Sequence, residues 1–182
     1  MVGDDMAAIV PPRRIALTDT LRRVRVACLT SDVAEVRVRP AGADDALVVA
    51  ALVLQCAIHR GGSGEPGFLD RYARAWLADE RHLPVWLAEV GDEHGGFLQA
   101  RVIDRLPLPG NEIAPELVVE VFFVRPTHRG LGVGEELLRA ATTWARDGGF
   151  AAAVMSAGPH TRAMVERVGF APDESAYRME LK

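Results

Sequence analysis

The stretch from Glu116 to Gly149, ELVVEVFFVRPTHRGLGVGEELLRAATTWARDGG, contains the signals that decide the fold. It begins with strand-forming residues at 117–124, rich in valine and phenylalanine. A turn at 125–128 (RPTH) follows, and a glycine-rich segment at 129–134 (RGLGVG) leads into an amphipathic helix. A strand, a glycine-rich turn and a helix start in this order favour a site for an anionic group.

The predicted helix start is suited to a phosphate, because the first four amides of a helix have no partner within it. The helix dipole gives these amides partial positive charge. A glycine lets the backbone approach a ligand without a Cβ in the way. We therefore expect Gly130, Gly132 and Gly134 to form a cradle for a pyrophosphate. The alternative is a surface turn that merely uses glycines.

The spacing of the glycines decides among three phosphate ligands. A Walker A loop needs Lys-Ser/Thr after its last glycine, whereas Glu135-Glu136 follow here. A dinucleotide fingerprint needs G-x-G-x-x-G early in a strand–helix repeat, whereas this G-x-G-x-G lies late in the chain. The pattern Arg129-x-x-Gly132-x-Gly134, directly after a strand ending in Val-Arg-Pro, resembles the R/Q-x-x-G-x-G/A signature of the GNAT superfamily of acyl-CoA-dependent acyltransferases.

Two further segments carry the same resemblance. Residues 38–45, Val-Arg-Pro-Ala-x-x-x-Asp, look like the first strand and helix of GNAT domains. Residues 162–170 resemble the family's R-x-L-Y-E-x-x-G-F pattern, with Val165 where a tyrosine is usual. The resemblance covers about Val36 to Lys182. It implies a GNAT-like domain at 35–182, of the α/β (α+β) class, with a mixed, mostly antiparallel sheet and helices on both faces.

The periodicity of the apolar residues predicts the same order of elements. Strands are expected at 35–39, 85–90, 97–103, 117–124, 151–156 and 174–181, the fifth of them buried. Helices are expected from Asp44 to about Arg60, at 68–79, after the glycines and at 159–168, the first being apolar nearly all round and well buried. A hairpin loop is predicted at 91–96, and a long loop at 104–115 that we expect to shape the acceptor side.

The composition is that of an ordinary soluble globular protein. The 182 residues are 49% hydrophobic and 25% charged, with a net charge of -4. This balance does not indicate a nucleic-acid partner, and the longest apolar run, 46–54, is too short to cross a membrane. A cytoplasmic protein is expected. The two cysteines and five histidines lack metal-ligand spacing, so we predict no metal.

Residues 1–34 are the least informative part of the chain. They are basic, broken by prolines, and predicted to form a disordered or loosely docked extension. The alternatives are an added strand, an arm that joins two copies into a homodimer, or a start codon set too early.

The resemblance implies acetyl-CoA as co-substrate. Its pantetheine arm would run beside the strand that ends at residue 124, and a backbone N–H there would serve as oxyanion donor. The residues implied to bind the cofactor are Phe122, Phe123, Val124, Arg129, Gly130, Leu131, Gly132, Val133, Gly134 and His160. For His160, a helix cap is the plainer interpretation.

The reaction also needs a group that accepts a proton, because a lysine-like amine is neutral in only about one molecule in 2,500 at pH 7. Glu120 is our candidate general base, since we expect it to be desolvated among valines and Phe122. An outward-facing or paired glutamate is the alternative, and Glu116 is the next candidate. The family's usual general acid has no match, because Val165 occupies its place.

The helix at 68–79 is expected to pack on the sheet beside the acceptor pocket. Tyr72 and Trp76 are candidate substrate-binding residues, although their spacing is also that of an ordinary amphipathic helix. The resemblance implies an N-acetyltransferase that moves an acetyl group from acetyl-CoA to a primary amine by direct transfer in a ternary complex. The acceptor would be a small molecule or a peptide amine. The rival hypothesis is a non-catalytic acyl-CoA-binding or regulatory module of the same fold.

Overall fold

The computed structural model describes residues 35–106, 109–110, 114–173 and 179. Five strands form one sheet in the order β1-β2-β3-β4-β5. Their bounds are β1 Val36–Pro40, β2 Val85–Val90, β3 Glu93–Ile103, β4 Glu116–Val124 and β5 Ala152–Met155. Neighbours from β1 to β4 pair antiparallel, and β5 pairs parallel with β4. The predicted mixed, mostly antiparallel sheet is confirmed.

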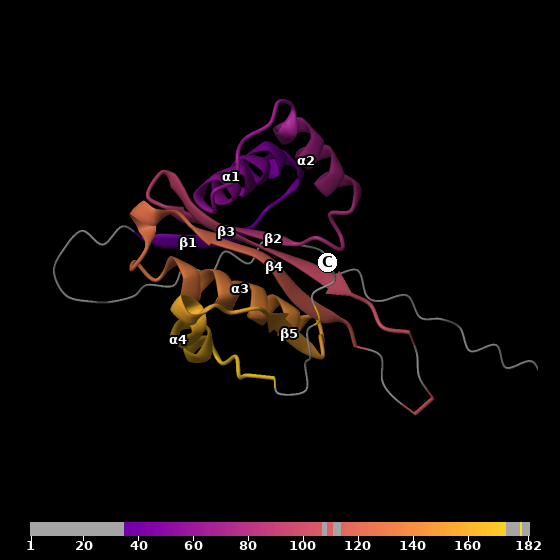
Figure 1. Cartoon of the computed structure of the whole chain (residues 1–182). Coiled ribbons are helices and arrows are strands. Elements are labelled where there is room, and N and C mark those ends of the chain that lie inside the picture. Colours follow the sequence, from indigo (N-terminus) through magenta and orange to yellow (C-terminus); the bar gives the residue numbers. More distant parts are fainter. Residues whose placement is uncertain (1–34, 107–108, 111–113, 174–178, 180–182) are drawn as a thin grey trace, which may run out of the picture.

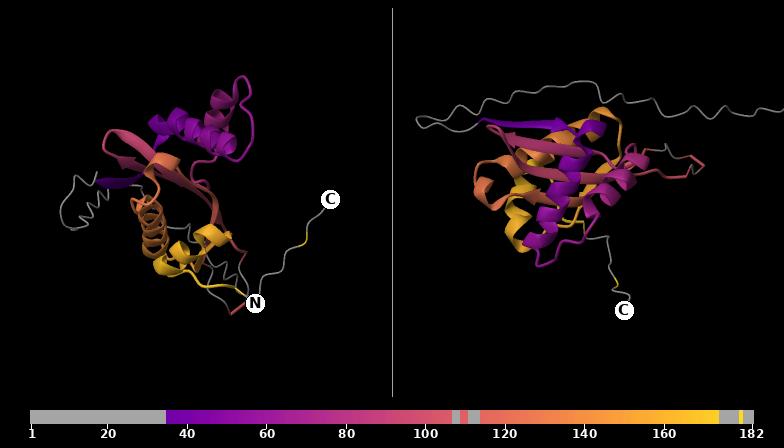
Figure 2. Two further views of the ribbon diagram at one scale, coloured as in Figure 1. Left: turned by 60° about the vertical axis from the view of Figure 1, so that its left-hand side comes forward. Right: turned by 90° about the horizontal axis from the view of Figure 1, so that it is seen from above.

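Helices cover both faces of the sheet, as Figures 1 and 2 show. On one face lie α1 (Ala46–His59), which follows a short 3-10 turn at Ala43–Asp45, and α2 (Phe68–Ala78). On the other face lie α3 (Val133–Asp147), which follows the 3-10 turn Pro126–His128, and α4 (Pro159–Val168). Among the described residues, the order of strands and helices is the one predicted.

Strand alternation divides the buried side chains into two apolar cores. In β3, Phe97 faces α1 and α2, whereas the neighbouring Leu98 faces α3. Both side chains are 0% exposed, because helices cover each face of the sheet. The sheet is therefore fixed between two helical layers, and its register determines which residues face each layer.

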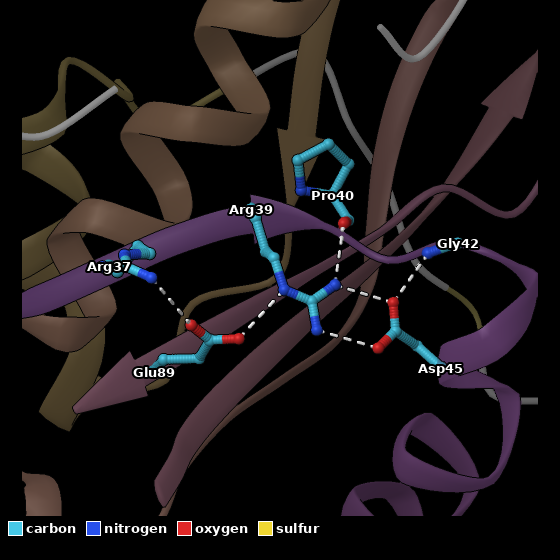
Figure 3. A network of polar contacts seen from close by, with 6 residues as sticks. All are labelled: Arg37, Arg39, Pro40, Gly42, Asp45 and Glu89. Atoms are coloured by element: carbon cyan, nitrogen blue, oxygen red, sulfur yellow. Dashed lines mark hydrogen bonds and ion pairs between the residues drawn. The ribbon is translucent and has the colours of Figure 1, made fainter. Parts of the chain in front are cut away.

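A polar network joins the start of α1 to the edge strand β1 (Figure 3). The Arg39 guanidinium donates to both Asp45 carboxylate oxygens, at 2.7 and 2.8 Å, and to Glu89 at 2.9 Å. Asp45 also accepts the Gly42 amide at 2.9 Å. The bond from Arg39 holds the pKa of the Asp45 carboxyl below its usual value. The network therefore sets the angle at which the chain leaves β1 for the helical layer.

Three expectations about individual elements need correction. The predicted loop at 91–96 is a turn at residues 91–92, and β3 already begins at Glu93. Gly96 lies within this strand, where a Cβ would stand 2.5 Å from the Phe123 carbonyl oxygen; close packing, not a loop, requires the glycine. The fifth strand is shorter than predicted and is not buried, since Val154 is 44% exposed.

The other differences are smaller. Helix α1 was expected to be well buried, but it buries only one side and leaves Leu47 and Ile58 more than half exposed, at 56% and 53%. The predicted strand at 174–181 lies outside the described residues, apart from Met179. The predicted extension at 1–34 also lies outside them.

We predict that Arg39→Gln lowers the free energy of unfolding by about 1–3 kcal/mol at pH 7, because it removes charge-assisted hydrogen bonds to two carboxylates. Asp45 has a lowered pKa in the folded protein. Its share of the stability is therefore complete above its unfolded pKa, about 3.9, and is lost as the pH falls through the lower folded value. Urea unfolding should show the difference between wild type and variant shrinking below about pH 4.

Arg37→Gln is the matched control, since Arg37 lies on the same strand but is 46% exposed and 4.0 Å from Glu89. Its effect should stay within about 0.5 kcal/mol. Equal losses in the two variants, or a difference that does not depend on pH, would contradict the role given to the Arg39–Asp45 pair.

Candidate active site

The far half of β4 has an open edge. Pairing with β5 runs from Glu116 to Val119 and ends there, because β5 ends at Met155. β4 continues to Val124, paired only with β3. Half of the backbone groups at 120–124 therefore point to a side on which no described strand pairs with them. This edge can accept an extended ligand as an added strand.

A β-bulge marks the point where this open edge begins. Gln99 lies opposite Val121, whereas the next residue of β3, Ala100, lies opposite Val119. Glu120 is thus the extra residue of β4. In such a bulge both residues of the longer strand project to the side of their single partner. Val119 packs on the α3 side and Val121 on the α2 side, so the bulge brings Val121 onto the face that Glu120 already occupies, beside Gln99.

The other end of the open edge leads into the glycine-rich loop. Gly130 and Gly132 have φ values of +81° and +80°, which side chains with a Cβ rarely adopt, and open space surrounds both. Gly132 is the N-cap of α3, and no side chain caps this helix. The first amides of α3 are left for a ligand. The loop thus leaves backbone amides and open space at the place where the sequence predicts a pyrophosphate.

Two residues of the predicted cradle are also packing residues. A Cβ on Gly134 would stand 2.8 Å from the Met164 sulfur and 3.0 Å from the Phe122 ring. Helix α4 can lie this close to α3 only because residue 134 is a glycine. Val133 is 1% exposed. These two residues can therefore offer a ligand only their backbone amides.

Acidic side chains in the first turn of α3 have basic partners. Glu135 pairs with Arg167 of α4, with Nε to Oε1 at 2.8 Å, and more loosely with Arg139 at 3.7 Å. Glu136 also lies 3.9 Å from Arg139. These arginines offset charges that would otherwise oppose an anion at this helix start.

Arg129 lies between the end of β4 and the end of α1. Its Nε donates to the Val124 carbonyl at 3.3 Å, and its Nη2 lies 2.7 Å from Nε2 of His59. His59 was not predicted; with no motif around it, only the folded contact identifies it. His160, the last of the predicted cofactor residues, is exposed in the first turn of α4.

The structure brings Tyr72 next to the bulge. Its hydroxyl donates to the side-chain oxygen of Gln99, which is 8% exposed. Burial, with a smaller contribution from the charge of Glu120, raises the pKa of Tyr72 to about 12. The phenol therefore stays protonated at neutral pH and acts as a hydrogen-bond donor. Gln99 was not predicted from the sequence, because a single glutamine in an apolar strand is not part of a recognisable motif.

Glu120 is not desolvated as the sequence suggested. Its side chain is 31% exposed and forms an ion pair with Arg101, with Nε to Oε1 at 2.6 Å and Nη2 to Oε2 at 3.4 Å. The expectation of an apolar surrounding is wrong, because Arg101 of the neighbouring strand projects to the same face and pairs with the carboxylate. The paired glutamate, the alternative interpretation, describes the geometry.

Two further residues lie in the cores. Trp76 is 2% exposed, and its indole N–H donates to the Leu83 carbonyl at 2.8 Å. It packs between α2 and the sheet and leaves no surface for an acceptor. Val165 is 5% exposed in the core beneath α3, so a packing residue fills the place of the family's tyrosine.

The described part of the chain contains no group of three or more His, Cys, Asp or Glu side chains arranged to hold a metal ion. None of its helices is long and apolar enough to span a membrane.

Solved structures with this fold include several acetyltransferases. A predicted acetyltransferase from Clostridium acetobutylicum, solved with acetyl-CoA, is 17% identical, with a TM-score of 0.65 over 80% of this chain and 96% of that one. The aminoglycoside acetyltransferase meta-AAC0020 from an uncultured soil metagenomic sample, solved with sisomicin, is 14% identical, with a TM-score of 0.65 over 81% and 95%. A ribosomal-protein-alanine N-acetyltransferase from Brucella melitensis biovar Abortus 2308 is 23% identical, with a TM-score of 0.61 over 81% and 99%.

No curated protein matches the sequence. The family model described as "Acetyltransferase (GNAT) family" matches residues 53–170, which is more than half of the chain. This span includes the bulged strand, the glycine-rich loop and both helices beneath them. The chain therefore belongs to the GNAT family of acetyltransferases.

Proposed function

We propose that the protein transfers an acetyl group from acetyl-CoA to a primary amine, directly, within a ternary complex. One observation carries this proposal: a single strand, β4, joins a bulged carboxylate, an open edge and an uncapped helix start. The similar structure from Clostridium acetobutylicum was solved with acetyl-CoA, which supports the choice of co-substrate.

The residues proposed to bind the cofactor follow from the order of these features along β4. The amides at the start of α3, shaped by Gly130 and Gly132, would hold the pyrophosphate, with Arg129 adding positive charge. The backbone of Phe122, Phe123 and Val124 would hold the pantetheine arm. Four residue steps separate the bulge from Val124, about 13 Å of strand, which suits an extended arm between a phosphate and a thioester.

The acceptor would approach on the α2 side of the bulge. Tyr72 and Gln99 present polar groups there, and the Glu120 carboxylate lies on the same face. Asp79 adds a second carboxylate, 3.9 Å from Arg101. These acidic groups favour a cationic amine. The aminoglycoside and ribosomal-protein acetyltransferases of similar fold support either a small molecule or a peptide as acceptor.

In the proposed reaction Glu120 accepts one proton. The amine nitrogen bonds to the thioester carbon while the carbon–sulfur bond breaks, and the sulfur leaves with the bonding electrons. A backbone N–H of β4 donates to the carbonyl oxygen, where negative charge develops. Glu120 takes the proton from the amine, directly or through water. No acid is needed at residue 165. The thiolate of a thiol with a pKa near 8.5 is a good leaving group, and it then takes a proton from water.

We predict that Gly132→Asp abolishes CoA binding in a folded protein, because it places a side chain and a negative charge where the pyrophosphate belongs. Gly149→Asp is the matched control, since this glycine also has positive φ, +73°, but lies beyond the opposite end of α3. CoA at about 100 times its dissociation constant should stabilise the wild type and the control by roughly 2.7 kcal/mol. Thermal melts measure this directly.

Unchanged CoA affinity in a folded Gly132→Asp variant would place the phosphate elsewhere. A wild-type melting temperature that millimolar CoA does not raise would contradict the proposed function as a whole.

We predict that Glu120→Gln lowers turnover by about 10²–10⁴, the usual contribution of a general base. CoA affinity should hardly change, because the cradle is intact, and the acidic limb of the pH profile should disappear. Glu116→Gln is the comparison, since Glu116 lies at the start of β4 and pairs with Arg105 at 2.5 Å. It should keep near wild-type turnover.

Thiol release from acetyl-CoA with a panel of amines measures both variants. Wild-type turnover and an unchanged limb in Glu120→Gln would exclude Glu120 as the base. CoA binding without turnover on any amine, in the wild type, would favour a non-catalytic binding module.

A further inference from the structure

We propose that Arg101 is a positioning residue for the reaction: it holds the Glu120 carboxylate aimed at the acceptor. This inference rests on the proposed function, because it assigns Arg101 a role only if Glu120 accepts the proton. The contact itself is two-pronged, with Nε to Oε1 at 2.6 Å and Nη2 to Oε2 at 3.4 Å.

The contact follows from the register of the two strands. Arg101 of β3 lies opposite Val118, and Glu120, two residues further along β4, projects to the same face as Val118. In a regular strand, alternation would give Val118 and Glu120 the same face, but it would then turn Val121 away from Gln99's side. The bulge keeps both Glu120 and Val121 on the Gln99 side. Arg101, Gln99 and Glu120 thereby share one surface beneath Tyr72.

A second carboxylate faces Arg101 from the opposite direction. Asp79, which follows α2, places Oδ2 3.9 Å from Nη1 of Arg101 and Oδ1 2.6 Å from Nδ1 of His82. Arg101 is therefore drawn toward α2 as well as toward the bulge. Its side chain is still 39% exposed, so an acceptor can reach the carboxylate that it holds.

The charged and titratable groups around Glu120 come from three directions. Arg101 faces it from β3, Tyr72 faces it from α2, and Asp79 and His82 lie behind Arg101. Arg101 makes the direct contact, and the hydrogen bond to Glu120 also raises the pKa of Arg101 itself. The guanidinium therefore stays charged throughout the working pH range.

The guanidinium acts on the carboxylate through its geometry. It is planar and restricts the rotation of the carboxylate, so that one lone pair stays turned to the open side. Lysine would supply the charge without the two-pronged geometry.

The test is the kcat and KM for the amine in Arg101→Gln and Arg101→Lys, with acetyl-CoA saturating. In Arg101→Gln the kcat should fall by about 10- to 100-fold, because the base loses its orientation. Arg101→Lys keeps the charge but not the two-pronged contact, so it should restore only part of the kcat. The KM for acetyl-CoA should be unchanged in both variants.

Arg105→Gln is the matched control. Arg105 makes a similar ion pair with a β4 glutamate, Glu116, but at the start of the strand and away from the bulge. Its removal should leave the kcat unchanged. A merely structural role for Arg101 would lower the melting temperature, or weaken acetyl-CoA binding together with the kcat.

The two hypotheses fail separately. If Glu120→Gln keeps wild-type turnover, the proposed base is wrong. If Glu120→Gln loses turnover but the folded Arg101→Gln variant keeps the wild-type kcat, Glu120 remains the base and the role of Arg101 is overturned.

Discussion

The bulge at Glu120 is the constraint on which the candidate site depends. One extra residue in β4 breaks the alternation that the rest of the strand obeys, so that Glu120 and Val121 both lie on the face of α2, beside Gln99. It also lies where β4 separates from β5, at the start of the open edge. The acceptor side and the cofactor side thus meet at one irregularity of one strand.

The cofactor end of the candidate site, at the glycine-rich loop and the start of α3, depends on backbone electrostatics. The glycine loop supplies the backbone conformation, and the uncapped start of α3 supplies the donors. Neither depends on a charged side chain, yet Glu135 in the first turn would oppose an anion if Arg167 did not pair with it. The packing of α4 on α3 therefore serves binding as well as stability, and Gly134 permits it by leaving room for Met164.

The sequence predicted the parts of this arrangement that are local. Periodicity identified the described helices and strands, and the glycine spacing identified the loop, because each depends on neighbouring residues. The environment of Glu120 could not be predicted, since it depends on register between strands. Gln99, Arg101 and His59 were missed for the same reason: each acquires its partner only when distant segments meet. For Trp76 the spacing allowed both a packing residue and a pocket residue, and the fold buries its side chain in the core.

Hydrogen exchange of the backbone amides, with and without CoA, tests the central claim most directly, because the claim concerns backbone groups rather than side chains. If β4 and the start of α3 hold the cofactor, CoA should slow exchange at residues 121–124 and 131–135 together, while the amides of α1 change little. Protection confined to other segments, or none at 131–135 under conditions where CoA is bound, would contradict the account.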